Sequence, residues 1–118
     1  MINLPYLERA HEAFKMSMFD DALKYYTIEL DTDPLNIAIM INIGFIHYFR
    51  YDLFNAKFFF SQALQLSENS QIAWFGLFLV ARRMKDRDLE RQALYKVYEI
   101  NELPFDMLLE NVQTFYEN

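Results

Sequence analysis

The sequence contains no cysteine, two glycines and three prolines among its 118 residues. A chain without cysteine forms no disulfide, no thiolate zinc site and no cysteine nucleophile. So little glycine and proline excludes collagen-like and loop-rich folds and disfavours an all-β domain with many turns. Because proteins of the reducing cytosol do not depend on disulfides, the missing cysteine fits a cytoplasmic location.

Basic residues and long apolar runs are also scarce. The 11 lysines and arginines face 17 aspartates and glutamates, a formal net charge of −6. We therefore expect no nucleic-acid partner, because a polyanion needs a basic surface. The most apolar stretch, Ile37 to Phe49, falls short of the roughly 20 apolar residues that a membrane span requires, so we expect no membrane insertion. The first residues carry neither the basic nor the apolar segment of a signal peptide.

Apolar and aromatic residues are abundant, and their spacing is helical. They make up 53% and 18% of the chain, which excludes intrinsic disorder. Apolar residues recur at i, i+3, i+4 and i+7, one face of a helix, in two neighbouring segments. The first set is Met40, Ile43, Gly44 and His47, and the second is Ala56, Phe59, Phe60 and Ala63. Tyr51 and Asp52 separate them, so the pattern predicts two helices joined by a short turn.

This pattern repeats along the chain with a period of 34 residues. Ala22 precedes Ala56 by that interval, and Tyr26 precedes Phe60. The period predicts an all-α domain of three antiparallel helix hairpins at about 3–36, 37–70 and 71–103. A final helix at about 104–117 is expected to cover the open end with Phe105, Leu108, Leu109, Val112 and Phe115. We also expect Pro34 to begin the second hairpin, with Asp33 as its N-cap.

Together these motifs resemble the tetratricopeptide repeat (TPR) family over nearly the whole chain. The second unit has Ile43-Gly44, then Ala56-x3-Phe60, and the third has Trp74-x2-Leu77. The third unit departs from the family at Phe78 and Glu90. Its hairpin is therefore expected to pack at a wider angle, or with Ala93 in the place of the usual alanine. The resemblance implies a right-handed superhelix with a concave groove that binds protein segments.

The candidate binding residues lie on a second apolar stripe along the first helix of each hairpin. In the family the first helices line the groove, so the resemblance makes this stripe groove-lining, together with Asn42. The candidates are Leu7, Ile41, Asn42, Phe45, Tyr48, Phe49, Ile72, Phe75 and Leu79. Arg82 and Arg83, from a basic cluster beside the third first helix, would attract an acidic part of the partner. Two alternatives stay open: the stripe packs only against neighbouring first helices, or a second copy of the chain covers it.

No pattern in the sequence indicates catalysis or a cofactor. The glycines, Gly44 and Gly76, fall inside helices, so there is no glycine-rich phosphate loop. No serine has a G-x-S-x-G setting. His11 and His47 lack the spacing and further ligands of a metal site. We therefore expect a protein that is not an enzyme and needs no metal or cofactor.

One known ligand class of the family is not expected here. The clamp that binds acidic chaperone C-termini uses Lys, Asn, Asn, Lys and Arg on three first helices. The matching positions are Leu7, His11, Asn42, Ile72 and Gly76, of which Asn42 alone agrees. An apolar or amphipathic protein segment is the expected partner. The alternatives are a structural subunit that forms a homodimer, and a chaperone similar in architecture to those of type III secretion translocators.

Overall fold

A computed structural model describes residues 5–116, with side chains up to residue 112. Over this range the chain forms helices and no strand. Their order is α1 (Tyr6–Lys15), α2 (Phe19–Thr32), α3 (Ile37–Phe49), α4 (Leu53–Leu66), α5 (Gln71–Met84), α6 (Arg87–Ile100) and α7 (Phe105–Tyr116). Residues 3, 4 and 117 of the expected units and the side chain of Phe115 lie outside the described part.

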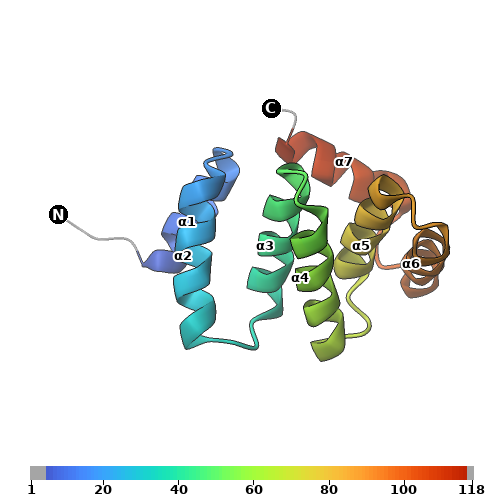
Figure 1. Cartoon of the computed structure of the whole chain (residues 1–118), viewed down its shortest axis with the longest axis horizontal. Coiled ribbons are helices and arrows are strands. Elements are labelled where there is room, and N and C mark those ends of the chain that lie inside the picture. Colours follow the sequence, from blue (N-terminus) through green and yellow to red (C-terminus); the bar gives the residue numbers. More distant parts are fainter. Residues whose placement is uncertain (1–4, 117–118) are drawn as a thin grey trace.

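The helices pair into three antiparallel hairpins, α1–α2, α3–α4 and α5–α6. Neighbouring hairpins pack through α2 against α3 and through α4 against α5, and α3 also contacts α5. Figure 1 shows the hairpins side by side along the longest dimension of the molecule, with α7 turning back across their upper ends. The all-α superhelix of three hairpins expected from the sequence is confirmed.

Each hairpin turns through one residue in the left-handed region. Ser17, Tyr51 and Lys85 have φ of 57°, 60° and 60°, and they lie 34 residues apart. After each of them the next amide donates to a carbonyl five residues back, as Asp52 N does to His47 O at 2.8 Å. This Schellman arrangement satisfies carbonyls that the helix end leaves open. No glycine supports these turns, so the backbone hydrogen bonds hold a strained conformation.

The helix starts repeat with the same period. Asn36 and Ser70 cap α3 and α5 by accepting hydrogen bonds from the amides of Ile39 and Ala73 at 3.1 and 3.3 Å. Pro34 therefore does not begin α3, and the expectation that it would was wrong. Asp33 ends α2 instead, and its carboxylate accepts a hydrogen bond from the Asn36 side chain at 3.0 Å. The Asn36 side chain satisfies an otherwise open amide, which places the helix start after it.

The centre of the core is the ring of Phe60, which inserts between two glycines. The ring is fully buried, and one of its edges meets both Gly44 on α3 and Gly76 on α5. A methyl group on Gly44 would lie 2.8 Å from the Phe60 Cε1 atom, and one on Gly76 would lie 2.5 Å from Cζ. Both glycines thus permit close helix approach.

In the third hairpin the alanine role falls to another position. Ala22 and Ala56 are fully buried in the first two hairpins. In α6, Ala93 is fully buried whereas Glu90 is only half-buried. The packing therefore follows the shifted register, one of the two possibilities that the sequence left open.

Candidate peptide-binding groove

The first helices of the hairpins and α7 border an apolar cavity of about 180 Å³ that is open to solvent. We name it the inner groove. Its lining residues come from α1, α3, α5 and α7, and they are Phe14, Ile41, Asn42, Phe45, Ile72, Asn111 and Val112. Four of the binding residues proposed from the sequence are among them, namely Ile41, Asn42, Phe45 and Ile72. Most of the lining is apolar, so the cavity suits a large hydrocarbon side chain.

A more polar hollow of about 280 Å³ adjoins the inner groove. It shares Phe14 and Asn42 with the groove and adds His11, Lys15 and Tyr26. The Asn42 amide donates to the Tyr26 hydroxyl at 3.1 Å, and that hydroxyl lies 2.5 Å from His11 Nδ1. Burial raises the pKa of Tyr26 to about 12, although the Asn42 hydrogen bond opposes this. Tyr26 therefore stays protonated at neutral pH, and its hydroxyl can donate a hydrogen bond to His11 Nδ1.

Three other candidates from the sequence do not line the inner groove and are as buried as its Ile41 and Phe45. Phe75 is 0% exposed, and Tyr48 and Leu79 are buried as well. The Phe105 ring of α7 meets Phe75 edge-on, with centroids 5.5 Å apart. A single chain thus covers most of the apolar stripe that the sequence analysis offered to a partner.

Two further candidates lie at the edge of the stripe. Leu7 is half-buried on α1. Phe49 is half-buried at the end of α3, where its ring stacks on Phe19 at 6.0 Å and on Phe45 at 6.1 Å. Neither lines the inner groove. Phe49 links the first and second hairpins through aromatic contacts, and its part in binding stays a prediction.

The two candidate arginines differ in their contacts. The Arg83 guanidinium lies 3.9 Å from the centroid of the Tyr48 ring and 4.5 Å from that of Tyr51. It also donates to the Tyr48 carbonyl at 3.1 Å, which satisfies an acceptor at the end of α3. Arg82 is exposed. Arg83 therefore joins the second and third hairpins. Arg82 is the better candidate for attracting an acidic part of a partner.

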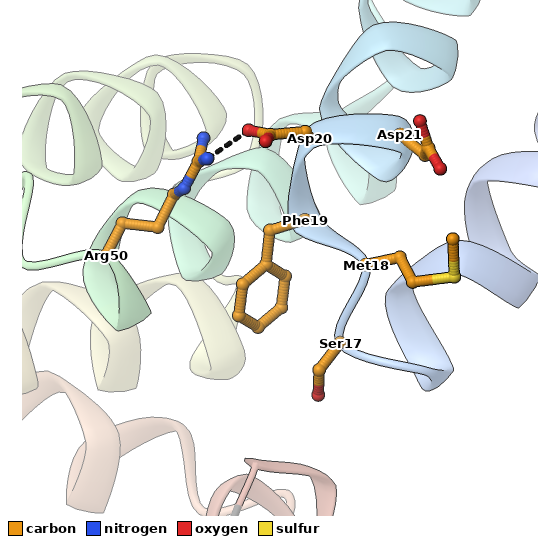
Figure 2. A pocket seen from close by; sticks show the side chains of 6 residues that line it. All are labelled: Ser17, Met18, Phe19, Asp20, Asp21 and Arg50. Atoms are coloured by element: carbon orange, nitrogen blue, oxygen red, sulfur yellow. Dashed lines mark hydrogen bonds and ion pairs between the residues drawn. The ribbon is translucent and has the colours of Figure 1, made fainter.

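A separate hollow of about 420 Å³ lies where the first and second hairpins meet, away from the inner groove. Figure 2 shows that the Asp20 carboxylate points to Arg50, with which it forms an ion pair, whereas Asp21 points away. Ser17, Met18 and Phe19 complete the lining. These contacts join two hairpins, and the hollow is a junction between them.

The sequence analysis missed three exposed aromatic residues of the second hairpin, which we call the exposed aromatic group. Phe54 and Phe58, one turn apart on α4, are 79% and 50% exposed, and Tyr51 in the preceding turn is 72% exposed. The signal was present in the sequence, because Phe54 and Phe58 fall outside the Ala56, Phe60 and Ala63 face.

The described residues form neither a metal-binding cluster nor a membrane-spanning helix. Residues 5–112 hold no cluster of three or more His, Asp or Glu side chains that could bind a metal ion. Of the helices described, none has the length and hydropathy needed to cross a bilayer.

These observations define a helical-repeat domain with a groove on its first helices. The fold is that of TPR domains. The first TPR domain of Spaghetti (RPAP3) bound to the HSP90 peptide SRMEEVD superposes with a TM-score of 0.81 at 17% identity, covering 95% of this chain and 88% of that one. The first TPR domain of human RPAP3 gives a TM-score of 0.79 at 17% identity, with coverage of 95% and 87%.

Comparison by sequence gives no closer assignment. No protein-family model matches the chain, and neither does any curated protein. An identity of 17% to the solved structures establishes the fold and leaves the ligand open.

Proposed function

We propose that this chain is a non-catalytic protein-interaction module, an adaptor or chaperone in the cytoplasm, that binds a partner segment in the inner groove. The observation that carries the proposal is the open apolar cavity bordered by α1, α3, α5 and α7. A neighbour of the same fold is bound to a peptide, which supports this use of the architecture. Pockets for apolar anchor side chains supply most of the affinity in such interfaces.

The chemistry of the groove favours a different ligand from the acidic peptide of that neighbour. At the positions matched to the clamp, Leu7 and Ile72 are hydrocarbon side chains, and Gly76 has none. Two carboxylates buried beside them would lack cations to pair with. The proposed ligand is an apolar or amphipathic segment. A chaperone for secreted translocator proteins is a narrower form of the same proposal.

A phage-displayed peptide library, selected on the immobilised chain, tests the proposal without a known partner. The selected peptides are synthesised with a fluorescent label, and their affinities are measured by fluorescence polarisation. Ile72→Arg places a charge in the groove, whereas Leu66→Arg makes the same change at an exposed position on α4. We expect Ile72→Arg to weaken binding at least tenfold and Leu66→Arg to leave it unchanged.

Circular dichroism melting curves confirm first that both variants fold. If the selected peptides bind both variants as tightly as the unchanged chain, the interface lies outside the inner groove. If the selection yields no peptide that binds, the proposed function is wrong.

The exposed aromatic group supports self-association as a second candidate function. Tyr51, Phe54 and Phe58 present three rings to solvent, and exposed aromatic patches mark interaction surfaces. The homodimer considered from the sequence relied on the apolar stripe, which the chain itself largely covers. Light scattering of the chain beside Phe54→Glu tests the new version. A dimer that dissociates in the variant supports it, and a monomer at all concentrations contradicts it.

A further inference from the structure

Helix α7 covers the part of the first-helix face where the sequence analysis placed binding residues. The Phe105 ring packs edge-on against Phe75 and Phe78 of α5, with centroid distances of 5.5 and 5.7 Å. Leu108 is 1% exposed, so it is buried to the same degree as residues of the central core. On its other side α7 presents the exposed acidic residues Asp106 and Glu110. Without α7, the aromatic face of α5 would be open to solvent.

The start of α7 is fixed by a buried glutamine. The Gln71 side chain is 3% exposed and donates to the carbonyls of Val97 and Leu103, both at 2.9 Å. Its carbonyl oxygen accepts a hydrogen bond from the Leu103 amide, also at 2.9 Å. These bonds hold the segment before α7 in place. This fixed segment would act as the pivot if α7 rotated away from α5. The hinge segment includes Asn101 in the left-handed region and Pro104.

The last described side chains of α7 lie beside the inner groove. Asn111 and Val112 face the cavity of the inner groove, whereas Phe105 and Leu108 contact the core directly. Among the described residues of α7, Val112 is half-buried, whereas Leu108 is 1% exposed. Elements with few buried contacts open at a lower free-energy cost than the core.

We propose that α7 is an internal occupant of the first-helix face, and that a partner's amphipathic helix displaces it and takes its place beside α5. This inference rests on the proposed function and names the ligand. The ligand pattern is the one that α7 itself presents: an aromatic residue, leucines three and four positions after it, and an apolar residue seven positions after it. In α7 these are Phe105, Leu108, Leu109 and Val112. Such spacing is how helices bind grooves.

The cavity beside Val112 makes the external helix the better ligand. A side chain larger than valine at that position would fill space that α7 leaves empty. Because α7 must first be displaced, the apparent affinity is the affinity for the open groove multiplied by the fraction of chains whose groove is open. The additional contact in the cavity offsets this cost. The partner helix is therefore expected to carry phenylalanine, leucine or methionine seven positions after its aromatic residue.

The test uses the full chain and a fluorescent peptide with the sequence of residues 104–116. Leu108→Asp in the chain weakens the internal α7 and opens the groove. We expect the peptide to bind this variant at least tenfold more tightly than the unchanged chain. A peptide carrying Val112→Phe should bind the variant more tightly again. The matched control is Asp106→Asn, on the exposed side of α7, which should bind the peptide as weakly as the unchanged chain.

Several results would overturn the proposal. The peptide binding neither chain, or binding the unchanged chain and the Leu108→Asp variant equally, would show that α7 holds no exchangeable position. A dimer of the unchanged chain that dissociates in the Leu108→Asp variant would identify α7 of a second copy as the occupant instead. If Leu108→Asp does not fold, Phe105→Ala replaces it, with the same tenfold difference required.

This experiment needs no outside partner, so it fails or succeeds independently of the library selection. In one possible outcome, binding of the library peptides depends on Ile72 and the α7 peptide never binds. That outcome would support the proposed function and contradict the exchange of α7. The opposite pair of results would show that the groove exchanges its own helix and has no external ligand.

Discussion

Replacing Gly76 with alanine should destabilise the domain by about 1–2 kcal/mol, although the same change usually stabilises a helix. Alanine is favoured over glycine within a helix by about 1 kcal/mol. Here a methyl group on Gly76 would lie 2.5 Å from the Phe60 Cζ atom and closer still to Cε1. Forcing extra volume into a packed core costs about 1–3 kcal/mol, and so short a contact with a fully buried ring belongs to the upper part of that range, about 2–3 kcal/mol, so the clash should outweigh the helical preference.

The ring cannot move aside easily, which is why the clash should persist. Gly44 meets the same edge of Phe60 from α3, and the Phe45 ring lies edge-on at 4.9 Å. A methyl group on Gly44 would be 2.8 Å from Cε1, a milder overlap. We therefore expect Gly44→Ala to cost less than Gly76→Ala.

Urea unfolding followed by circular dichroism measures both effects. With an m value of about 1.5 kcal/mol/M, Gly76→Ala should lower the midpoint by about 1 M. In a Phe60→Leu background the smaller side chain leaves room, so Gly76→Ala should there be neutral or stabilising. Equal losses in both backgrounds, or a raised midpoint for Gly76→Ala alone, would refute the argument that Phe60 requires the two glycines.

Three further changes probe other parts of the chain. Met18 precedes α2 without a capping side chain, so Met18→Ser should raise the free energy of unfolding in urea by about 0.5–1 kcal/mol. An unchanged free energy of unfolding would show that the start of α2 frays. Arg83→Lys should cost about 1 kcal/mol, because lysine cannot both stack on Tyr48 and reach its carbonyl, and a lysine variant as stable as the unchanged chain would reject this role. Burial lowers the pKa of His47 despite the opposing charge of Asp52, so the folded state disfavours the protonated ring. Stability should therefore fall as the pH drops below the ordinary histidine value of 6.5, and His47→Gln should reduce that dependence between pH 7.5 and 5.5.

The hairpins could be predicted from the sequence because their packing repeats. Ala22, Ala56 and Phe60 recur with the period of the fold, and each is fully buried. Periodicity reports which face of a helix is apolar, and this information is local. The role of Gly76 was not predictable in the same way, because it depends on a ring from another hairpin that enters between α3 and α5.

The path of α7 could not be read from its own residues. The spacing of Phe105, Leu108 and Val112 predicts an amphipathic helix with one buried face, and that much is correct for the described side chains. It does not say whether the helix extends the superhelix or turns back. That direction depends on the hinge and on the three hydrogen bonds of Gln71, a residue whose type is usually exposed.

The candidate site was predicted only in part for the same reason. The inner groove is lined by four of the candidates, because the position of a residue on a first helix decides whether it faces the groove. They are Ile41, Asn42, Phe45 and Ile72. Phe75 and Tyr48 satisfy the same rule, yet α7 and Arg83 cover them. Whether an apolar residue on such a face is open or covered depends on contacts between elements far apart in the sequence.

The position of Phe60 also bears on how the domain opens. A single ring from α4 fills the space between α3 and α5, so the second and third hairpins cannot separate without exposing it. The first hairpin is joined to the second by the Tyr26–Asn42 hydrogen bond and by the stacked rings of Phe19 and Phe49. In a linear array the weakest junction opens first. Amide hydrogen exchange should accordingly divide the chain into two cooperative units, with α1 and α2 exchanging before the helices that surround Phe60.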